Sequence, residues 1–98
     1  MIADLDKAFE SRVRIGIMAV LVVNSWVDHA RLRELLEVTD GNLASHLAAL
    51  EKLAYVEVRK RFMGKKPNTS YKGTTAGKRA FQAHLDALEQ LLKTNLRP

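Results

Sequence analysis

The sequence has no cysteine and no long apolar run. Disulfide bonds, thiolate metal sites and a cysteine nucleophile are therefore excluded. The longest apolar run, from Ile15 to Val23, covers nine residues, whereas a helix needs about 20 to cross a bilayer. The N-terminal segment carries Asp4, Asp6 and Glu10 instead of the basic start of a secretory signal. We therefore expect a cytoplasmic protein that does not bind membranes.

Motifs of common enzyme classes are also missing. The sequence contains no glycine-rich phosphate loop, no HExxH and no GxSxG. The histidines His29, His46 and His84 fall on separate predicted elements with no carboxylate at ligand spacing. One alternative remains: on a terminal helix, His84 could meet its copy in a dimer metal site, helped by Asp86 or Glu89. We expect no enzyme activity, no cofactor and no metal.

Positive charge is abundant and concentrated in one segment. The formal net charge is +5, from 16 Lys and Arg against 11 Asp and Glu. Eight of those 16 cations lie between Arg59 and Arg79, where there is no acidic residue. This distribution favours an anionic partner, and a solvated basic loop remains the alternative.

The order of the predicted elements indicates a mainly α domain with a small β-hairpin. A chain of 98 residues has room for one domain, which we take as 1–98. Two helices joined by a short turn and followed by a basic hairpin are the parts of a winged helix-turn-helix. Apolar spacing and capping residues predict helices at about 12–24, 30–36, 40–53 and 75–96. They also predict an extended segment at 27–29 and strands at 55–62 and 69–72. The helix-turn-helix then covers about 30–54 and the wing about 55–73.

Both ends of the chain carry more apolar surface than one small domain can cover. The first helix is apolar on opposite sides, and the last has a wide apolar stripe. We therefore predict a homodimer formed through the N- and C-terminal helices, about 1–24 and 75–98. The predicted interface residues are Leu5, Phe9, Ile15, Met18, Phe81, Leu85, Leu88 and Leu92.

The helix predicted from residue 40 presents small or uncharged side chains opposite its leucines. Asn42 can pair with adenine, Ser45 with several bases or a phosphate, and Ala49 can meet a thymine methyl group. His46 has two interpretations, a base contact or a partly buried side chain hydrogen-bonded at the helix edge. The N–H groups at the helix start suit a phosphate oxygen. An ordinary polar surface helix is the alternative; the predicted DNA-reading residues are Thr39, Gly41, Asn42, Ser45, His46 and Ala49.

The basic hairpin supplies a second surface for DNA. Lys65 and Lys66 precede Pro67, which we expect to stiffen the turn, so that the loop reaches phosphates or the minor groove. Arg59 and Arg61 alternate along one strand, share a face and can flank the phosphate backbone. Such contacts add affinity and salt dependence but no choice of sequence.

Three segments resemble the MarR/ArsR-like winged helix regulators, in the small single-domain group: FESRVRIGIM (9–18), TDGNLASHLAALEKLAYVEV (39–58) and GKKPNTSYKGTTAGKRAF (64–81). Such proteins are dimeric transcription factors whose third helix reads successive major grooves of an inverted repeat. The resemblance therefore implies a regulator of transcription, which we expect to be a repressor with an unknown effector, if any. It places Thr39, Asn42, Ser45 and His46 at DNA-reading positions and Lys65, Lys66, Asn68 and Thr69 in the wing.

Two positions depart from the family pattern. Ala54 stands where a glycine usually ends the recognition helix, so it either adopts a left-handed conformation, at a cost of about 1 kcal/mol, or extends the helix. Gly73 replaces a leucine at the end of the second wing strand, and the missing apolar contact predicts a mobile hairpin.

Two other functions remain as alternatives, a protein-interaction module and an RNA-binding module. The basic wing and the uncharged helix face favour DNA, because a protein interface would more often expose apolar residues there. The small side chains of Ser45 and Ala49, and the lack of exposed stacking aromatics, favour duplex DNA over RNA.

Overall fold

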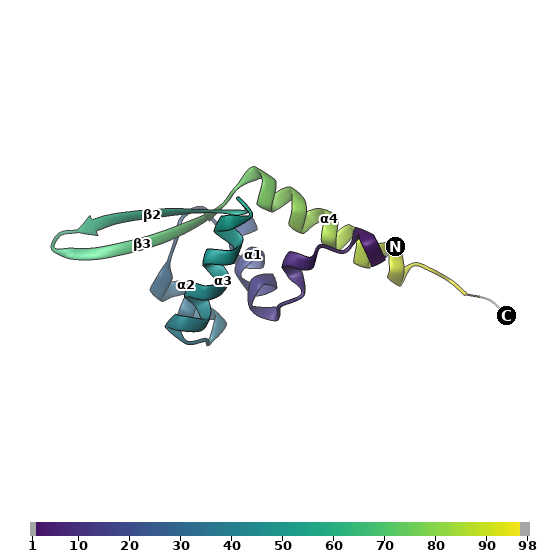
Figure 1. Ribbon diagram of the computed structural model, residues 1–98, viewed down its shortest axis with the longest axis horizontal. Helices are drawn as coiled ribbons and strands as arrows, with labels where there is room; N and C mark the ends of the chain where they lie inside the picture. Colours follow the sequence, from purple (N-terminus) through teal and green to yellow (C-terminus); the bar gives the residue numbers. More distant parts are fainter. Residues whose placement is uncertain (1, 97–98) are drawn as a thin grey trace.

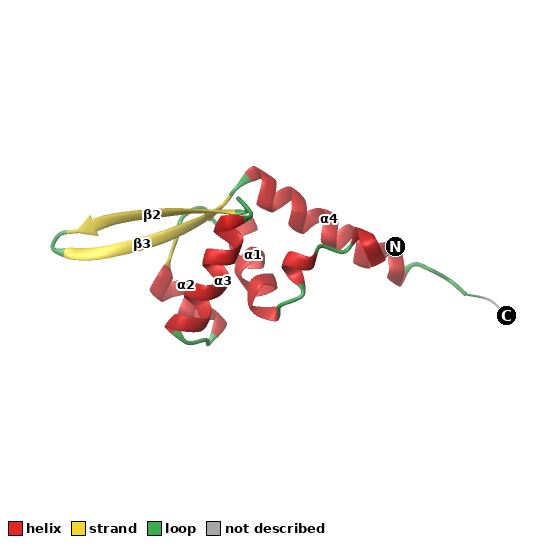
Figure 2. Cartoon of the chain, viewed as in Figure 1, coloured by secondary structure: helices red, strands yellow, loops and turns green. Residues whose placement is uncertain are grey.

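Four helices and a three-stranded antiparallel sheet make up residues 2–96, the part of the chain that this computed structural model describes (Figures 1 and 2). The strand order is β1-β3-β2. In chain order the elements are two 3₁₀ turns, η1 (Ile2–Asp4) and η2 (Lys7–Phe9), then α1 (Arg12–Val23), β1 (Val27–Asp28), α2 (His29–Leu36), α3 (Asp40–Lys52), β2 (Val56–Met63), β3 (Lys66–Gly73) and α4 (Thr75–Leu92).

Hydroxyl side chains cap three of the helices. Ser11, Thr39 and Thr74 each accept a hydrogen bond from the N–H three residues later, at 3.4, 3.1 and 2.9 Å. Each bond satisfies an amide that has no partner inside its helix. The predicted starts of α1 and α3 are confirmed, and Thr74 is the cap of α4.

The apolar core lies where α1, α2 and α3 meet the sheet. Leucines at spacings of four and three on α3 turn into it, as the pattern predicted. Leu35 on α2 does not join it and is 49% exposed, because the short α2 turns the side with Leu32 into the core. The buried apolar residues are Ala8, Phe9, Ile17, Met18, Leu21, Leu32, Leu43, Leu47, Leu50, Val56, Tyr71 and Phe81.

Strands β2 and β3 form a longer hairpin than predicted. Their eight residue pairs extend to Met63 opposite Lys66, which leaves only Gly64 and Lys65 in the turn. Gly64 has a φ of 67°, and glycine supplies such a positive φ at the first central position of a two-residue hairpin turn without steric cost.

Pro67 and Asn68 belong to β3, so the prediction that they form a loop is wrong. Pro67 pairs with Phe62 in the ladder and therefore cannot stiffen the turn. The outer part of β3 has β2 on one side, and β1 pairs only with its residues Tyr71 and Ser70. A residue without an N–H is tolerated on such an open edge.

Helix α3 ends at a left-handed residue. Ala54 has a φ of 62°, and its N–H donates to the Glu51 carbonyl at 2.9 Å. The Tyr55 N–H donates to the Leu50 carbonyl, also at 2.9 Å. This pair of bonds defines a Schellman motif. Ala54 therefore lies beyond the end of α3 and is exposed. Of the two predicted outcomes for this residue, the structure shows the left-handed conformation and not a longer helix.

Helix α4 begins in direct backbone contact with the end of α3. The Thr74 N–H donates to the Tyr55 carbonyl at 3.0 Å, and the Thr74 hydroxyl donates to the Ala54 carbonyl at 2.6 Å. A Cβ on the buried Gly77 would overlap the Tyr55 carbonyl oxygen. Only glycine fits this crossing.

Gly73 marks a second close approach, at the base of the hairpin. It is buried, and a Cβ there would lie 3.4 Å from the Leu21 carbonyl oxygen and 3.5 Å from the Leu21 Cβ. A Cβ there would be in van der Waals contact with α1, so the backbone at Gly73 already lies close against that helix. Backbone packing against α1 therefore replaces the apolar side chain expected there.

Helix α4 and the hairpin project in opposite directions from the core, and the N-terminal turns lie beside α4 (Figure 1). The principal extents are 66 × 25 × 21 Å. Helix α4 ends at Leu92, four residues before the predicted end, and Leu85, Leu88 and Leu92 are 41%, 39% and 85% exposed. Within residues 2–96, no helix combines the length and the apolar character that crossing a bilayer requires.

Candidate nucleic-acid interface

Between Gly41 and Ala48, the exposed side of α3 carries only small or uncharged side chains. Its charged residues are Asp40 at the first position and Glu51 and Lys52 at the end. The fully buried leucines occupy the opposite side. The exposed small residues are Gly41, Asn42, Ala44, Ser45 and Ala48.

Two of these residues, Ala44 and Ala48, face the hairpin. They line a shallow groove whose other wall includes Val58, Lys60 and Tyr71. Ala49, which was predicted to read DNA, is half-buried. The spacing of residues 41, 44, 45 and 48 would have identified the exposed stripe, because positions three and four apart share a helix face.

Asn42, Ser45 and Thr39 are exposed around the start of α3. Asn42 lines a different depression, beside Arg12 at the start of α1. The hydroxyl of Thr39 accepts the capping bond from the Asn42 N–H. Around the helix, Ser45 therefore lies between Asn42 on one side and Ala44 and Ala48 on the other.

His46 turns toward α1. It is half-buried, and its Nδ1 accepts a hydrogen bond from the Arg14 Nε–H at 3.0 Å. Of its two interpretations, the geometry favours the hydrogen-bonded side chain at the helix edge over the base contact.

Asp40 is held by two neighbours that sequence reasoning did not connect to it. Arg33 donates to both of its carboxylate oxygens, at 2.9 and 3.2 Å, and His29 Nε2 lies 3.2 Å from one of them. The hydrogen bond from Arg33 is the main reason that the pKa of the Asp40 carboxyl is lowered. The acidic group at the start of α3 is therefore ionised and paired with a cation.

The strands of the hairpin point their cations to opposite faces. Lys60 faces the groove beside α3, so the adjacent Arg59 and Arg61 lie on the other face, because side chains alternate along a strand. Arg59 places its guanidinium carbon 4.3 Å from the centre of the Trp26 ring. The two arginines share a face as expected, but it is the face away from α3. Sequence reasoning missed both Lys60 and Trp26.

The hairpin tip carries unpaired positive charge. Lys65 lies in the turn and Lys66 opens β3, and both are exposed. Between residues 2 and 96, no ion pair involves Lys60, Arg61, Lys65 or Lys66. Asn68 and Thr69 are half-buried, and the Asn68 Oδ1 lies 3.0 Å from the Ser70 hydroxyl. The tip lysines are thus available to an anion.

His84 lies inside the domain. It is 7% exposed, and its Nδ1 accepts a hydrogen bond from the Asp6 backbone N–H at 3.0 Å. The Asp6 carboxylate in turn accepts a 2.8 Å bond from the Tyr55 hydroxyl. Among residues 2–96, there is no group of three or more side chains that could hold a metal ion.

Three of the predicted interface residues are buried in the core of the single chain. Phe9, Met18 and Phe81 are 2%, 0% and 5% exposed, because their side of α1 and α4 packs against the rest of the same chain. Their side chains are therefore not exposed for contact with a second chain. The other predicted residues remain accessible or half-accessible: Leu5, Ile15, Leu85, Leu88 and Leu92.

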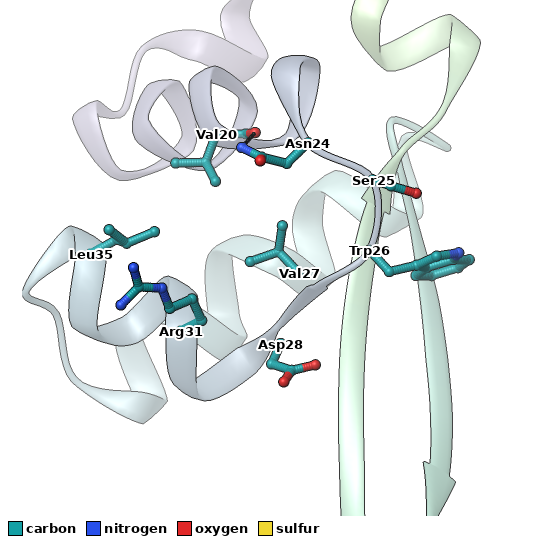
Figure 3. Close-up of a pocket in the computed structure, with 8 residues that line it drawn as sticks. All are labelled: Val20, Asn24, Ser25, Trp26, Val27, Asp28, Arg31 and Leu35. Atoms are coloured by element: carbon teal, nitrogen blue, oxygen red, sulfur yellow. Dashed lines mark hydrogen bonds between the residues drawn. The ribbon is translucent and has the colours of Figure 1, made fainter.

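An open pocket of about 570 Å³ separates the end of α1 from α2 (Figure 3). Val20, Val27 and Leu35 form its apolar part, while the Trp26 ring points away from it toward the hairpin. This pocket does not include any residue of α3.

Comparisons with known proteins match this arrangement. The sequence model of the winged helix DNA-binding domain matches residues 13–92. An uncharacterized protein of Methanocaldococcus jannaschii is 37% identical over 87 residues, covering 89% of this chain and 95% of that protein. A transcriptional regulator homologue from Pyrococcus horikoshii has 26% identity and a TM-score of 0.71, over 94% of this chain and 99% of that one. The apo form of MarR from E. coli shares the fold, with 22% identity and a TM-score of 0.70 over 97% of this chain and 73% of that one.

Proposed function

The chain belongs to the winged helix DNA-binding domain family, and from this premise we propose that it regulates transcription as a homodimer that binds an inverted repeat in duplex DNA. We propose that its action is repression, because a dimer seated on two major grooves excludes other proteins from the same DNA.

The observation that carries this proposal is the position of the α3 face next to a free lysine. Ala44 and Ala48 share a groove with Lys60 of the hairpin. Small side chains let the backbone of a helix approach base edges, while a neighbouring cation neutralises phosphate. The face and the lysine therefore suit one DNA duplex together.

The tip of the hairpin supports a second contact on the same duplex. It projects from the core (Figure 1) and presents Lys65 and Lys66 without ion-pair partners in residues 2–96. A projecting cationic loop reaches phosphates or a neighbouring minor groove.

The exposed leucines of α4 support the homodimer. Leu85, Leu88 and Leu92 lie along a helix that leaves the core, and exposed apolar rows of this kind mark interaction surfaces. A two-fold pairing through α4 would carry two copies of α3, which suits half-sites about 34–36 Å apart in successive major grooves.

Binding of the purified protein to labelled genomic duplex fragments over a salt series tests the proposal. We expect non-specific binding at low salt, preferential binding to a few fragments at higher salt, and two chains per bound site. The logarithm of the affinity should fall linearly with the logarithm of the salt concentration. A protein that binds no duplex at about 50 mM salt, where phosphate contacts are strong, or that prefers single-stranded RNA, would contradict the proposal.

A further inference from the structure

We infer that the exposed face of α3 selects A·T base pairs through the methyl groups of thymine and does not read guanine. This inference rests on the proposed function, since it concerns the DNA sequence that the same face binds.

The alanine methyl groups are the first support. Ala44 and Ala48 are exposed, one helical turn apart, on the side of α3 that faces the hairpin. Gly41 extends the same side toward the start of the helix, with no atom within 4 Å of the place where its Cβ would stand. The C5 methyl of thymine is the apolar group that a base pair presents in the major groove, and it pairs with small apolar side chains.

The second support is that α3 carries no arginine on this face. Guanine is most often read by an arginine or lysine that binds its O6 and N7 atoms. Helix α3 contains no arginine, and its lysine, Lys52, stands in the last turn. Three neighbouring arginines are bound elsewhere, Arg33 to Asp40, Arg14 to His46 and Arg59 to Trp26. Arg12 lines the depression beside Asn42 and is not among the residues that line the groove of the alanines.

The other flank of α3 points to the same class of base pair. Asn42 is exposed beside the start of α1, and an asparagine amide pairs with the N6 and N7 atoms of adenine. Lys60 and Glu51 line the same groove as the alanines, and Lys60, on the hairpin wall, suits a phosphate. The adenine contacted by Asn42 and the thymines contacted by the alanines both belong to A·T pairs. We therefore expect A·T pairs at the centre of each half-site.

The test begins with selection of bound duplexes from a random library, followed by affinity measurements on the best site. Each thymine is then replaced singly by deoxyuridine, which removes the methyl group and leaves base pairing intact. We expect A·T pairs at the centre of each half-site and a loss of about fourfold in affinity for each contacted methyl group removed. These measurements use the unaltered protein, so folding does not affect them.

Glycine variants assign the contacts to residues. A44G and A48G should each weaken binding by a similar factor and abolish the sensitivity to uracil at one position. A19G removes a methyl group from an exposed position of α1 and is the matched control, which should keep both the affinity and the uracil effect.

The outcomes separate this inference from the proposed function. Selected half-sites centred on an invariant guanine, or an affinity unchanged by uracil at every position, would overturn the inference while duplex binding stands. A protein that selects no duplex from the library would overturn the proposed function itself.

Discussion

Arg59 stacks its guanidinium on the ring of Trp26, with 4.3 Å between the guanidinium carbon and the ring centre. Lys72 approaches the same ring, with its Nζ 5.8 Å from the centre. Trp26 directly precedes β1, whereas Arg59 and Lys72 belong to the hairpin. The Arg59 Nε is buried without a hydrogen-bond partner in residues 2–96, so the ring provides a contact for a cation that this nitrogen does not otherwise anchor. The ring therefore joins the body of the domain to the base of the hairpin.

Replacing this ring should loosen the hairpin. For W26L we expect a loss of about 1–2 kcal/mol in the free energy of unfolding, because a desolvated cation–π contact contributes up to about 2 kcal/mol. Amide hydrogen exchange should rise in β2 and β3 more than in α3. W26F should keep part of the protection, and F62A, at an exposed position of the hairpin, is the control. Hairpin amides of the unaltered protein that exchange as slowly as those of the helices would contradict the expected mobility.

The tip lysines and Asn42 should have separable effects on DNA binding. The pair K65A and K66A should weaken binding to all sequences and lower the salt slope by about two units, because about one counterion is released per neutralised phosphate. N42A should cost about 1–3 kcal/mol on the specific site and little on other DNA. Fluorescence anisotropy over a salt series measures both. If the two variants change the same quantities, the assigned roles are wrong.

The α3–α4 crossing should not tolerate a side chain. G77A should destabilise the fold by about 3 kcal/mol, because overpacking against backbone cannot be relieved by a rotamer change. Urea denaturation measures the change. G41A is the matched control, since a Cβ at Gly41 meets no atom within 4 Å; it should stabilise α3 by about 0.5–1 kcal/mol. Equal effects of the two variants would show that the crossing is not rigid.

The end of α3 should be improved by glycine. A54G is expected to stabilise the protein by about 1 kcal/mol, because an alanine at a φ of 62° has an unfavourable contact that glycine lacks. Thermal denaturation followed by circular dichroism measures the gain. A48G, inside helix α3, is the control and should lower the melting temperature instead.

Charge on the outer face of α4 should prevent dimerisation. L88E places a carboxylate on a leucine that is 39% exposed, and pairing of two such faces would bury both charges without partners. Sedimentation should then show a monomer, with a loss of affinity for an inverted repeat. Q90E changes charge at another exposed position of α4 and should remain dimeric. An unaltered protein that sediments as a monomer at high concentration would contradict the proposed assembly.

Local signals in the sequence were enough to place most elements. Ser11 and Thr39 cap helices in the structure because a hydroxyl that accepts an N–H bond needs only its own neighbouring residues. The leucine spacing on α3 likewise identified its buried side. These features depend on contacts within one turn of a helix, which a sequence pattern records directly.

The features that the sequence did not reveal depend on pairs of distant residues. Pro67 suggested a loop, but the ladder with β2 continues through it because its edge is open. Met18 and Phe81 were assigned to a partner, but they fill the core of the same chain. Apolar periodicity shows that a residue is buried, and not which surface covers it. The contact between Trp26 and Arg59 has no local signature at all.

The crossing of α4 over the end of α3 has a consequence for the length of the DNA site. In a dimer built on α4, the backbone contact at Gly77 and Tyr55 fixes the offset from the two-fold axis to each recognition helix before DNA is present. A flexible joint would let one protein accept several spacers between half-sites. The rigid crossing favours a single spacer length. Inserting one base pair between the half-sites should therefore lower the affinity more than changing a base within either half-site.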